Sequence, residues 1–210
     1  MPIHAAWTRN QLLVAFHLYC QLPFGRMHSR NPLIVQCAER IGRTPSALAM
    51  KLTNIASLDP AITSSGRKGL VGASATDRAM WEEIHLDWSR FCDESRDAMK
   101  TFDLGHVFSF QAPREDESSA CVNYEGKETQ SISKTRVGQA FFRRSVLSSY
   151  EYRCCITGLA VPELLVASHI LPWRVDAANR LNPRNGLCLN AIHDRAFDQG
   201  IITVTAKMTI

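Results

Sequence analysis

The most restrictive feature of this sequence is a set of short apolar runs gathered in its last third. The stretches LLVASHILPW and LNPRNGLCL each hold a brief apolar run beside turn residues, and NAIHDRAFDQG follows with helical spacing up to Gly200. Short apolar runs bounded by turn signals predict strands, and a glycine after a periodic run predicts the end of a helix. We therefore expect strand, loop, strand and helix in this order.

The residues before this region predict a longer helix. Residues 134–150 read KTRVGQAFFRRSVLSSY, with apolar side chains at helical spacing. Arg136, Gln139 and Arg143 share one face because they are three and four residues apart. Such a face can bind phosphate, or it can simply keep the helix in water. The sequence leaves both interpretations open.

The front of the chain predicts three helices. Thr8 with Gln11 forms a capping box before an apolar periodic run. Asn31 with Pro32, and then Thr44 with Pro45, are typical helix starts. The stretch CAERIGRTPSALAMKL has the small residues and the glycine of a helix-turn-helix, with its third helix running to about Leu58.

The opening Trp7-Thr8 and the later GRTPSAL resemble Myb/SANT-like three-helix DNA-binding modules. This resemblance implies that Arg40, Arg43 and Lys51 meet phosphates and that Asn54 faces a groove of the DNA. The alternative is a small helical bundle that packs on the rest of the protein.

The charges are distributed in blocks. Residues 1–68 hold eight Lys or Arg against two acids, and residues 134–195 hold nine against four. Residues 77–97 reverse the balance, with three against seven. Two basic blocks favour two surfaces for a polyanion, although ordinary solvated helix faces give the same pattern.

These patterns divide the chain into three parts. Residues 1–105 are expected to form the helical DNA-binding module, residues 106–133 a polar linker or exposed loop, and residues 134–210 the strand-containing domain. Within the first part, residues 77–100 predict one acidic amphipathic helix. That helix either closes the module or pairs with a second subunit.

The seven cysteines are scattered, and no C-x-x-C pair occurs. We therefore expect reduced thiols and no structural zinc, with Cys154, Cys155 and Cys188 acting as small buried hydrophobes. No apolar run approaches the roughly 20 residues that cross a bilayer. The first residues also lack a signal-peptide pattern. A cytoplasmic protein without a membrane partner is the expectation.

The span from about Arg136 to Ile202 resembles the HNH endonuclease family. The resemblance lies in four motifs in order, C-x-x-T-G, A-S-H-I-x-P-W, N-G-L and F-D-x-G. It implies a ββα-metal nuclease domain that cuts DNA with one divalent cation per site. It also implies a setting in bacterial restriction or another defence against foreign DNA.

The resemblance implies catalytic roles for two residues. His169 stands where the family has its general base, and imidazole is the side chain that exchanges a proton near neutral pH. Asn185 matches the central asparagine, whose amide orients His169 or the loop that carries it. A lone histidine between Ile170 and Leu171 could otherwise be an ordinary core residue.

The metal ligands are less regular. Many relatives have an acid or a histidine immediately before the base, and this chain has Ser168 there. Asp194 stands at the family's final histidine, with His193 ahead of it and Asp198 four residues later on the same helix face. Oxygen ligands of this kind suit Mg²⁺ or Mn²⁺. We expect Asp194 to be the first ligand, and His193 and Asp198 to be further candidates.

The sequence thus predicts an α+β protein in which an all-helical DNA-binding module precedes an HNH nuclease domain. Its expected activity is metal-dependent hydrolysis of double-stranded DNA, and one site per chain favours a homodimer for cutting both strands. The rival hypothesis is a DNA-binding regulator or sensor whose nuclease domain has lost its chemistry. Nothing in the residues separates DNA from RNA as the substrate.

Overall fold

The computed structural model describes residues 6–67, 69–109 and 129–205, without the side chains of residues 106, 109 and 129–137. The first half is helical, and the second half contains a long helix, a two-stranded sheet and a short helix. The elements of the first half are α1 (Arg9–Gln21), the 3₁₀ turn η1 (Phe24–Arg26), α2 (Pro32–Arg40), α3 (Pro45–Ala56), α4 (Pro60–Thr63), α5 (Ala75–Leu86), α6 (Trp88–Thr101) and α7 (Gly105–Ser109). Those of the second half are α8 (Thr129–Ser149), η2 (Pro162–Leu164), β1 (Leu165–His169), η3 (Pro183–Asn185), β2 (Gly186–Asn190) and α9 (Ala191–Asp198).

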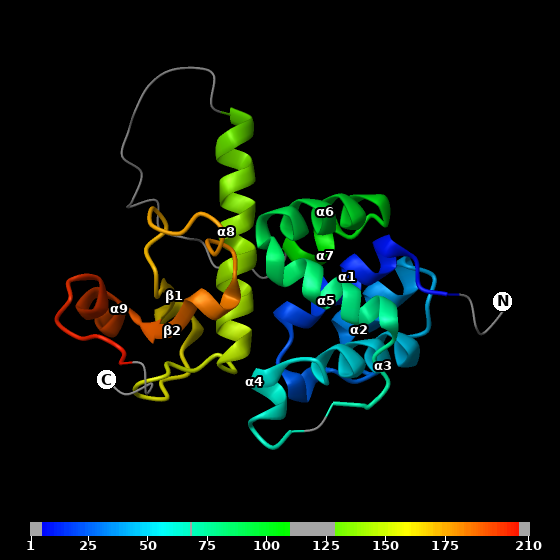
Figure 1. The fold of residues 1–210 in the computed structure, drawn as a ribbon, viewed down its shortest axis with the longest axis horizontal. Coiled ribbons are helices and arrows are strands. Elements are labelled where there is room, and N and C mark those ends of the chain that lie inside the picture. Colours follow the sequence, from blue (N-terminus) through cyan, green and yellow to red (C-terminus); the bar gives the residue numbers. More distant parts are fainter. Residues whose placement is uncertain (1–5, 68, 110–128, 206–210) are drawn as a thin grey trace.

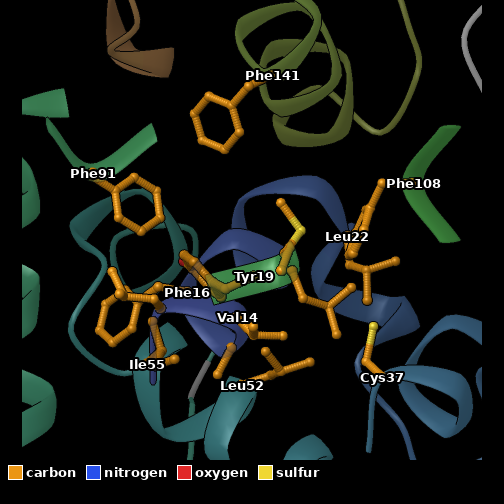
Figure 2. Close-up of a cluster of buried hydrophobic side chains, with 14 of the residues drawn as sticks. Val14, Phe16, Tyr19, Leu22, Cys37, Leu52, Ile55, Phe91, Phe108 and Phe141 are labelled. Atoms are coloured by element: carbon orange, nitrogen blue, oxygen red, sulfur yellow. The ribbon is translucent and has the colours of Figure 1, made fainter. Parts of the chain in front are cut away.

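Helix α8 lies between the helices of the first half and the two strands (Figure 1). It contacts α1 and α6 on one side and β1, β2 and η3 on the other. Phe141 packs edge-to-face on Phe91 of α6, with ring centroids 5.9 Å apart, and both rings belong to one cluster of buried side chains (Figure 2). The two halves therefore share one hydrophobic core, and α8 contributes side chains to it.

The helix starts follow the sequence. Thr8 and Gln11 form the capping box of α1, and Asn31 and Thr44 cap α2 and α3 with a proline at the first helical position. Gly42 adopts a φ of +69° in the turn between α2 and α3, a conformation that glycine tolerates best. These local expectations are confirmed, and α3 ends at Ala56, slightly earlier than expected.

The acidic segment 77–100 is two helices and not one. Asp87 has extended backbone angles, with φ −150° and ψ 90°, which end α5. Its carboxylate then accepts a hydrogen bond from the backbone N–H of Arg90 at 2.9 Å and so caps the start of α6. The apolar stripe continues across this break, so the hydrophobic pattern alone predicts a single helix.

Most of the expected linker lies outside the described residues. Its first residues belong to α7, and its last residues, from Thr129 onward, already belong to α8. Helix α8 thus begins at Thr129 and not at Lys134, the start that the sequence pattern predicted.

The two strands form an antiparallel hairpin that lies against α8. Leu165 pairs with Asn190 at one end, and His169 pairs with Gly186 at the other. A side chain at Gly186 would collide with Val146 and Phe142 of α8. The hairpin can approach α8 this closely because residue 186 is glycine. The small sheet among helices agrees with the expected α+β class.

No helix in the described part of the chain combines the length and the apolar character needed to span a bilayer.

Candidate active site

His169 is the last residue of β1 and is held between two aromatic rings. Its imidazole stacks on Phe142 of α8, with ring centroids 3.9 Å apart and planes 4° from parallel. The indole of Trp173 meets it edge-on at 5.6 Å and 88°. The side chain is half-buried, so the ring is fixed in orientation while part of it stays accessible.

The hydrogen bond of this imidazole decides which nitrogen can act as a base. Nε2 of His169 lies 2.9 Å from the carbonyl oxygen of Arg180. A carbonyl can only accept, so we assign the proton of the neutral ring to Nε2. Nδ1 then keeps its lone pair and is the atom that can take a proton from water.

Asn185 is buried and fixes the loop that follows His169. Its Oδ1 accepts from the backbone N–H of Leu171 at 2.8 Å, and its Nδ2 donates to the carbonyl oxygens of Leu171 at 3.1 Å and Asn179 at 3.3 Å. The backbone N–H of Ile170 also donates to the carbonyl of Asn185 at 2.9 Å. Of the two roles expected for its amide, these contacts match the holding of the loop.

Further side chains in this loop support the site, and sequence reasoning did not identify them. The Asp176 carboxylate accepts from the side chain of Asn179 at 2.7 Å and from the backbone N–H of Asn179 and Ala178, and these bonds lower the pKa of Asp176. The guanidinium of Arg180 donates to the Trp173 carbonyl at 2.7 Å and lies over the Trp173 ring. The Asn- and Asp-rich composition of the loop was the available signal, because such residues bond to nearby backbone.

The candidate metal ligands lie on the other side of the hairpin. Ser168 and His169 are consecutive in β1, so their side chains point to opposite faces. Ser168 faces α9, where its hydroxyl is buried without a hydrogen-bond partner of acceptable geometry. Burial raises the pKa of Asp194 on α9, the nearby Ser168 hydroxyl partly offsets this rise, and the negative charge of Asp198 adds to it.

His193 is directed toward a cysteine. Its Nδ1 lies 3.7 Å from Sγ of Cys154, in the turn before β1. Burial alone raises the pKa of Cys154, but hydrogen bonds from Thr157, His193 and the backbone of Ile156 lower it to about 6. The expected burial of Cys154 and Cys188 is confirmed, and Cys154 in addition takes part in hydrogen bonds that lower its pKa. Cys155 differs from expectation, because it is exposed.

The expected base and the expected ligands have different neighbours in the structure. Within the described residues, no three His, Cys, Asp or Glu side chains gather in a group that could hold a metal. The contacts of His169 are to Phe142, Trp173 and Arg180, and those of Asp194 are on the α9 face. The convergence of His169 and Asp194 on one phosphate stays a prediction.

The part of the chain that carries these residues matches a known protein family. Residues 154–205 match the HNH endonuclease family. The matched HNH segment runs from the C-x-x-T-G turn past α9, and it includes His169, Asn185 and His193. The resemblance seen in the sequence is confirmed over this range. The match does not extend to α8 or to the helices α2 and α3.

Searches of curated proteins and of solved structures gave no match to this chain.

Of the front-module residues expected to bind nucleic acid, Lys51 is buried. Its ammonium is 2.8 Å from Oδ1 and 2.9 Å from Oδ2 of Asp77, and it lies over the ring of Trp7 at 5.1 Å. The expectation that Lys51 meets phosphate is corrected here, because a carboxylate inside the protein already holds it.

Arg43 is also engaged within the protein. Its guanidinium donates to Gln11 at 2.9 Å and to the carbonyl of Ala6 at 2.6 Å, and it lies 4.8 Å from the Trp7 ring centroid. Arg40 is exposed and pairs with Asp103 at 3.0 Å. Arg43 thus joins the start of α1 to the turn before α3, whereas Arg40 stays at the surface.

The second half of α3 is covered by its own chain. The backbone N–H of Leu70 donates to the carbonyl of Thr53, and a side chain at Gly69 would collide with the backbone of Thr53 and Ser57. Asn54 is half-buried beside this segment. A DNA-reading role for α3, with Asn54 facing a groove of the DNA, stays a prediction.

The face of α8 expected to bind phosphate is only partly described. Gln139 is exposed and Arg143 is half-exposed. Arg136 lies two helical turns before Arg143, and its side chain is outside the described residues. Their binding to nucleic acid stays a prediction.

Proposed function

We propose that this protein is a metal-dependent endonuclease that hydrolyses phosphodiester bonds in DNA, with Nδ1 of His169 as the general base. The proposal rests above all on one contact, the bond from Nε2–H of His169 to the carbonyl of Arg180. This bond fixes the tautomer that leaves Nδ1 basic. The family match over residues 154–205 supplies the reaction class.

The proposed step is a proton transfer coupled to attack on phosphorus. A water molecule loses a proton to Nδ1 of His169 as its oxygen forms a bond to phosphorus, and the bond from phosphorus to the leaving sugar oxygen breaks. The Arg180 carbonyl stabilises the imidazolium that forms, because Nε2–H becomes a stronger donor. Stacking on Phe142 prevents the ring from turning away during the transfer.

Asn185 is proposed as a positioning residue for this step. It holds the backbone of Leu171 from both its N–H and its C=O, and it also bonds to Asn179. The carbonyl of Arg180 follows Asn179 directly in the same loop. Asn185 therefore acts on the imidazole through the loop that carries the acceptor.

The α9 face fits an oxygen-preferring cation in part. Asp194 and Asp198 interact as like charges, and the buried Ser168 hydroxyl near Asp194 has no hydrogen-bond partner of acceptable geometry. A cation relieves the repulsion and supplies that partner. Asp194 would hold Mg²⁺ or Mn²⁺ first, with Asp198 and His193 as further candidates. When bound, the cation supplies positive charge for the phosphate and the leaving oxygen.

Binding of DNA is proposed to involve Arg136, Gln139 and Arg143 on α8. The basic character of residues 134–195 supports this surface. A homodimer that cuts both strands, a cytoplasmic location and a role in bacterial restriction or defence belong to the same proposal.

A second function is favoured by a specific observation. Within the described residues, no group of three His, Cys, Asp or Glu side chains could hold a metal, and Ser168 occupies the place where the family resemblance implies a ligand. A DNA-binding regulator or sensor with an inactive nuclease domain would have this arrangement without penalty.

Cleavage assays separate the two functions. Plasmid and linear DNA are incubated with the protein and Mg²⁺, Mn²⁺ or EDTA, beside His169→Ala. The control is His28→Ala, which removes an exposed imidazole outside the site. Metal-dependent cutting that is lost only in His169→Ala supports the nuclease. DNA binding by all three proteins without any cutting supports the regulator.

A further inference from the structure

A large groove lies between the front helices and α8. Its volume is about 1750 Å³, and its walls come from the end of α1, from η1 and α2, and from α8 with the turn that follows it. Five arginines line it: Arg26, Arg40, Arg143, Arg144 and Arg153. Two of these, Arg40 and Arg143, come from different halves of the sequence and meet in one groove.

The positive charge of this groove is neutralised only in part, since Arg40 pairs with Asp103. The two carboxylates in its lining are Glu39 and Glu151, and Glu151 is already paired with Arg67. Among the residues that the structure describes, no carboxylate forms an ion pair with Arg26, Arg143 or Arg144. An anionic ligand would supply the missing partner.

Three of the guanidinium groups converge on one side chain. Burial raises the pKa of Tyr152, while the nearby charges of Arg144, Arg26 and Arg143 oppose that rise. Arg144 is half-buried, and burial lowers its pKa. Arginines that line one groove repel one another, and phosphates bound among them relieve that repulsion.

Apolar side chains lie among the arginines in the lining of the groove. Pro23, Leu33 and the ring of Tyr152 are partly exposed, whereas Leu22 and Leu147 are buried in the core. Single strands bind where a basic groove follows the backbone and apolar or aromatic side chains contact the bases. In a duplex the bases are paired with each other and their faces are stacked, so they cannot contact such side chains.

We infer that this groove binds one single strand of nucleic acid, with its phosphates at Arg26, Arg143 and Arg144 and its bases against Pro23, Leu33 and the ring of Tyr152. The inference rests on the proposed nuclease function for its biological meaning, and it adds a site for one separated strand to the proposed cutting of DNA. Arg143 follows Phe142 directly in α8, and Phe142 carries the imidazole of His169. The bound strand and the proposed base are thus positioned by the same helix.

The test is equilibrium binding measured by fluorescence anisotropy. The probes are a labelled single strand of about 16 nucleotides, within the site sizes of single-strand-binding folds, and the duplex of the same length. The test variant is Arg26→Gln with Arg143→Gln. The control is Arg78→Gln, which removes an exposed arginine of α5 that is not part of the groove. His169→Ala is the background for all of them, so that cleavage does not disturb the measurement.

We expect the single strand to bind more tightly than the duplex. The double variant should weaken single-strand binding on the order of tenfold at low salt, and it should reduce the slope of log K against log[salt] by about 1.4, or roughly 0.7 for each lost phosphate contact. Arg78→Gln should change neither quantity. Millimolar inorganic phosphate should compete only weakly with the strand. Strong competition would instead indicate a site for a small free anion, which phosphate would saturate.

Several outcomes would overturn the inference. One is an unchanged single-strand affinity in the double variant, and another is a loss confined to the duplex. Complete competition by inorganic phosphate would indicate a small-anion site. Failure of the nuclease proposal is recognised separately, since a protein that never cuts DNA can still lose strand binding in the groove variant.

Discussion

The imidazole of His169 on β1 lies flat against the ring of Phe142 on α8, with centroids 3.9 Å apart. The neighbouring Phe141 packs on Phe91 of α6. Successive side chains of an α-helix diverge by roughly 100°, so these two phenylalanines reach in different directions. One helix therefore joins the core of the front half to the residue proposed as the base.

Replacing Phe142 with Ala should reduce both stability and cleavage. The ring is 2% exposed, and truncation of a buried Phe costs about 3–5 kcal/mol. Loss of the stack should also free the imidazole to turn, which lowers kcat in the folded fraction. Urea denaturation and single-turnover cleavage measure the two effects. Phe142→Leu should recover most of the stability but little of the rate, and equal recovery of both would contradict a role for the stack.

Removal of the Asn185 amide should disorganise the loop after His169. Asn185→Ala leaves the backbone N–H of Leu171 and two carbonyls without a partner, and a buried unsatisfied group costs about 1–3 kcal/mol. Cleavage should fall mainly through kcat. The control is Asn182→Ala, which removes another loop amide that does not contact Leu171. A rise in KM alone would mean that Asn185 serves DNA binding instead.

The sequence predicts these elements well where the determinants are local. The caps at Thr8, Asn31 and Thr44 each depend on residues within one turn, and all three are present. The strands and α9 follow from short apolar runs and glycine. The break at Asp87 is harder to foresee, because an aspartate can either continue a helix surface or cap a new helix.

The sequence does not predict which neighbouring helix a strand side chain will face. Alternation in β1 requires Ser168 and His169 to point to opposite faces, but it does not say which face α8 covers and which α9 covers. That choice depends on packing between segments far apart in the chain, such as Gly186 against Phe142 and Val146. The same limit applies to Lys51, whose partner Asp77 lies 26 residues away.

The buried pair of Lys51 and Asp77 should be a stability element. The two side chains are 8% and 0% exposed, and removal of one partner of a buried pair costs about 3–5 kcal/mol. Lys51→Met should therefore lower the urea midpoint strongly while the folded protein keeps its DNA affinity. The matched control, Lys100→Met, breaks an exposed pair with Asp97, where about 0–1 kcal/mol is expected. Weaker DNA binding at full stability would restore Lys51 to the nucleic-acid surface.

Acid should destabilise the front half through His17. Burial, assisted by the charges of Arg144 and Arg96, lowers the pKa of His17 to about 3. Between pH 6.5 and about 3 the unfolded chain holds a proton on this imidazole that the folded chain lacks. Stability is therefore present above pH 6.5 and declines as the pH falls through this window, by about 1.4 kcal/mol per pH unit from this group.

The variant His17→Gln isolates that contribution from the carboxylates that titrate in the same range. Its free energy of unfolding, measured by urea at several pH values, should depend less steeply on pH than that of the wild type. The buried neighbours Ser95 and Gln21 contact the imidazole, so the variant should also be less stable at pH 7. Parallel pH profiles for the two proteins would show that His17 is protonated in the fold.

The last prediction concerns the cation proposed for the α9 face. A ligand that binds only the folded state stabilises it by RT ln(1 + [L]/Kd), or about 2.7 kcal/mol at a hundredfold excess over Kd. Mn²⁺ should therefore raise the Tm of the wild type and leave that of Asp194→Asn unchanged. Because the pKa of Asp194 is raised by burial and by Asp198, protons should compete with the cation, and the Mn²⁺ shift should shrink as the pH is lowered.

Ser168→Ala is the informative companion, since it removes an unpartnered buried hydroxyl and should be at least as stable as the wild type without metal. A reduced Mn²⁺ shift in Ser168→Ala would identify this hydroxyl as part of the cation site, whereas an undiminished shift in Asp194→Asn would place the cation elsewhere on the protein.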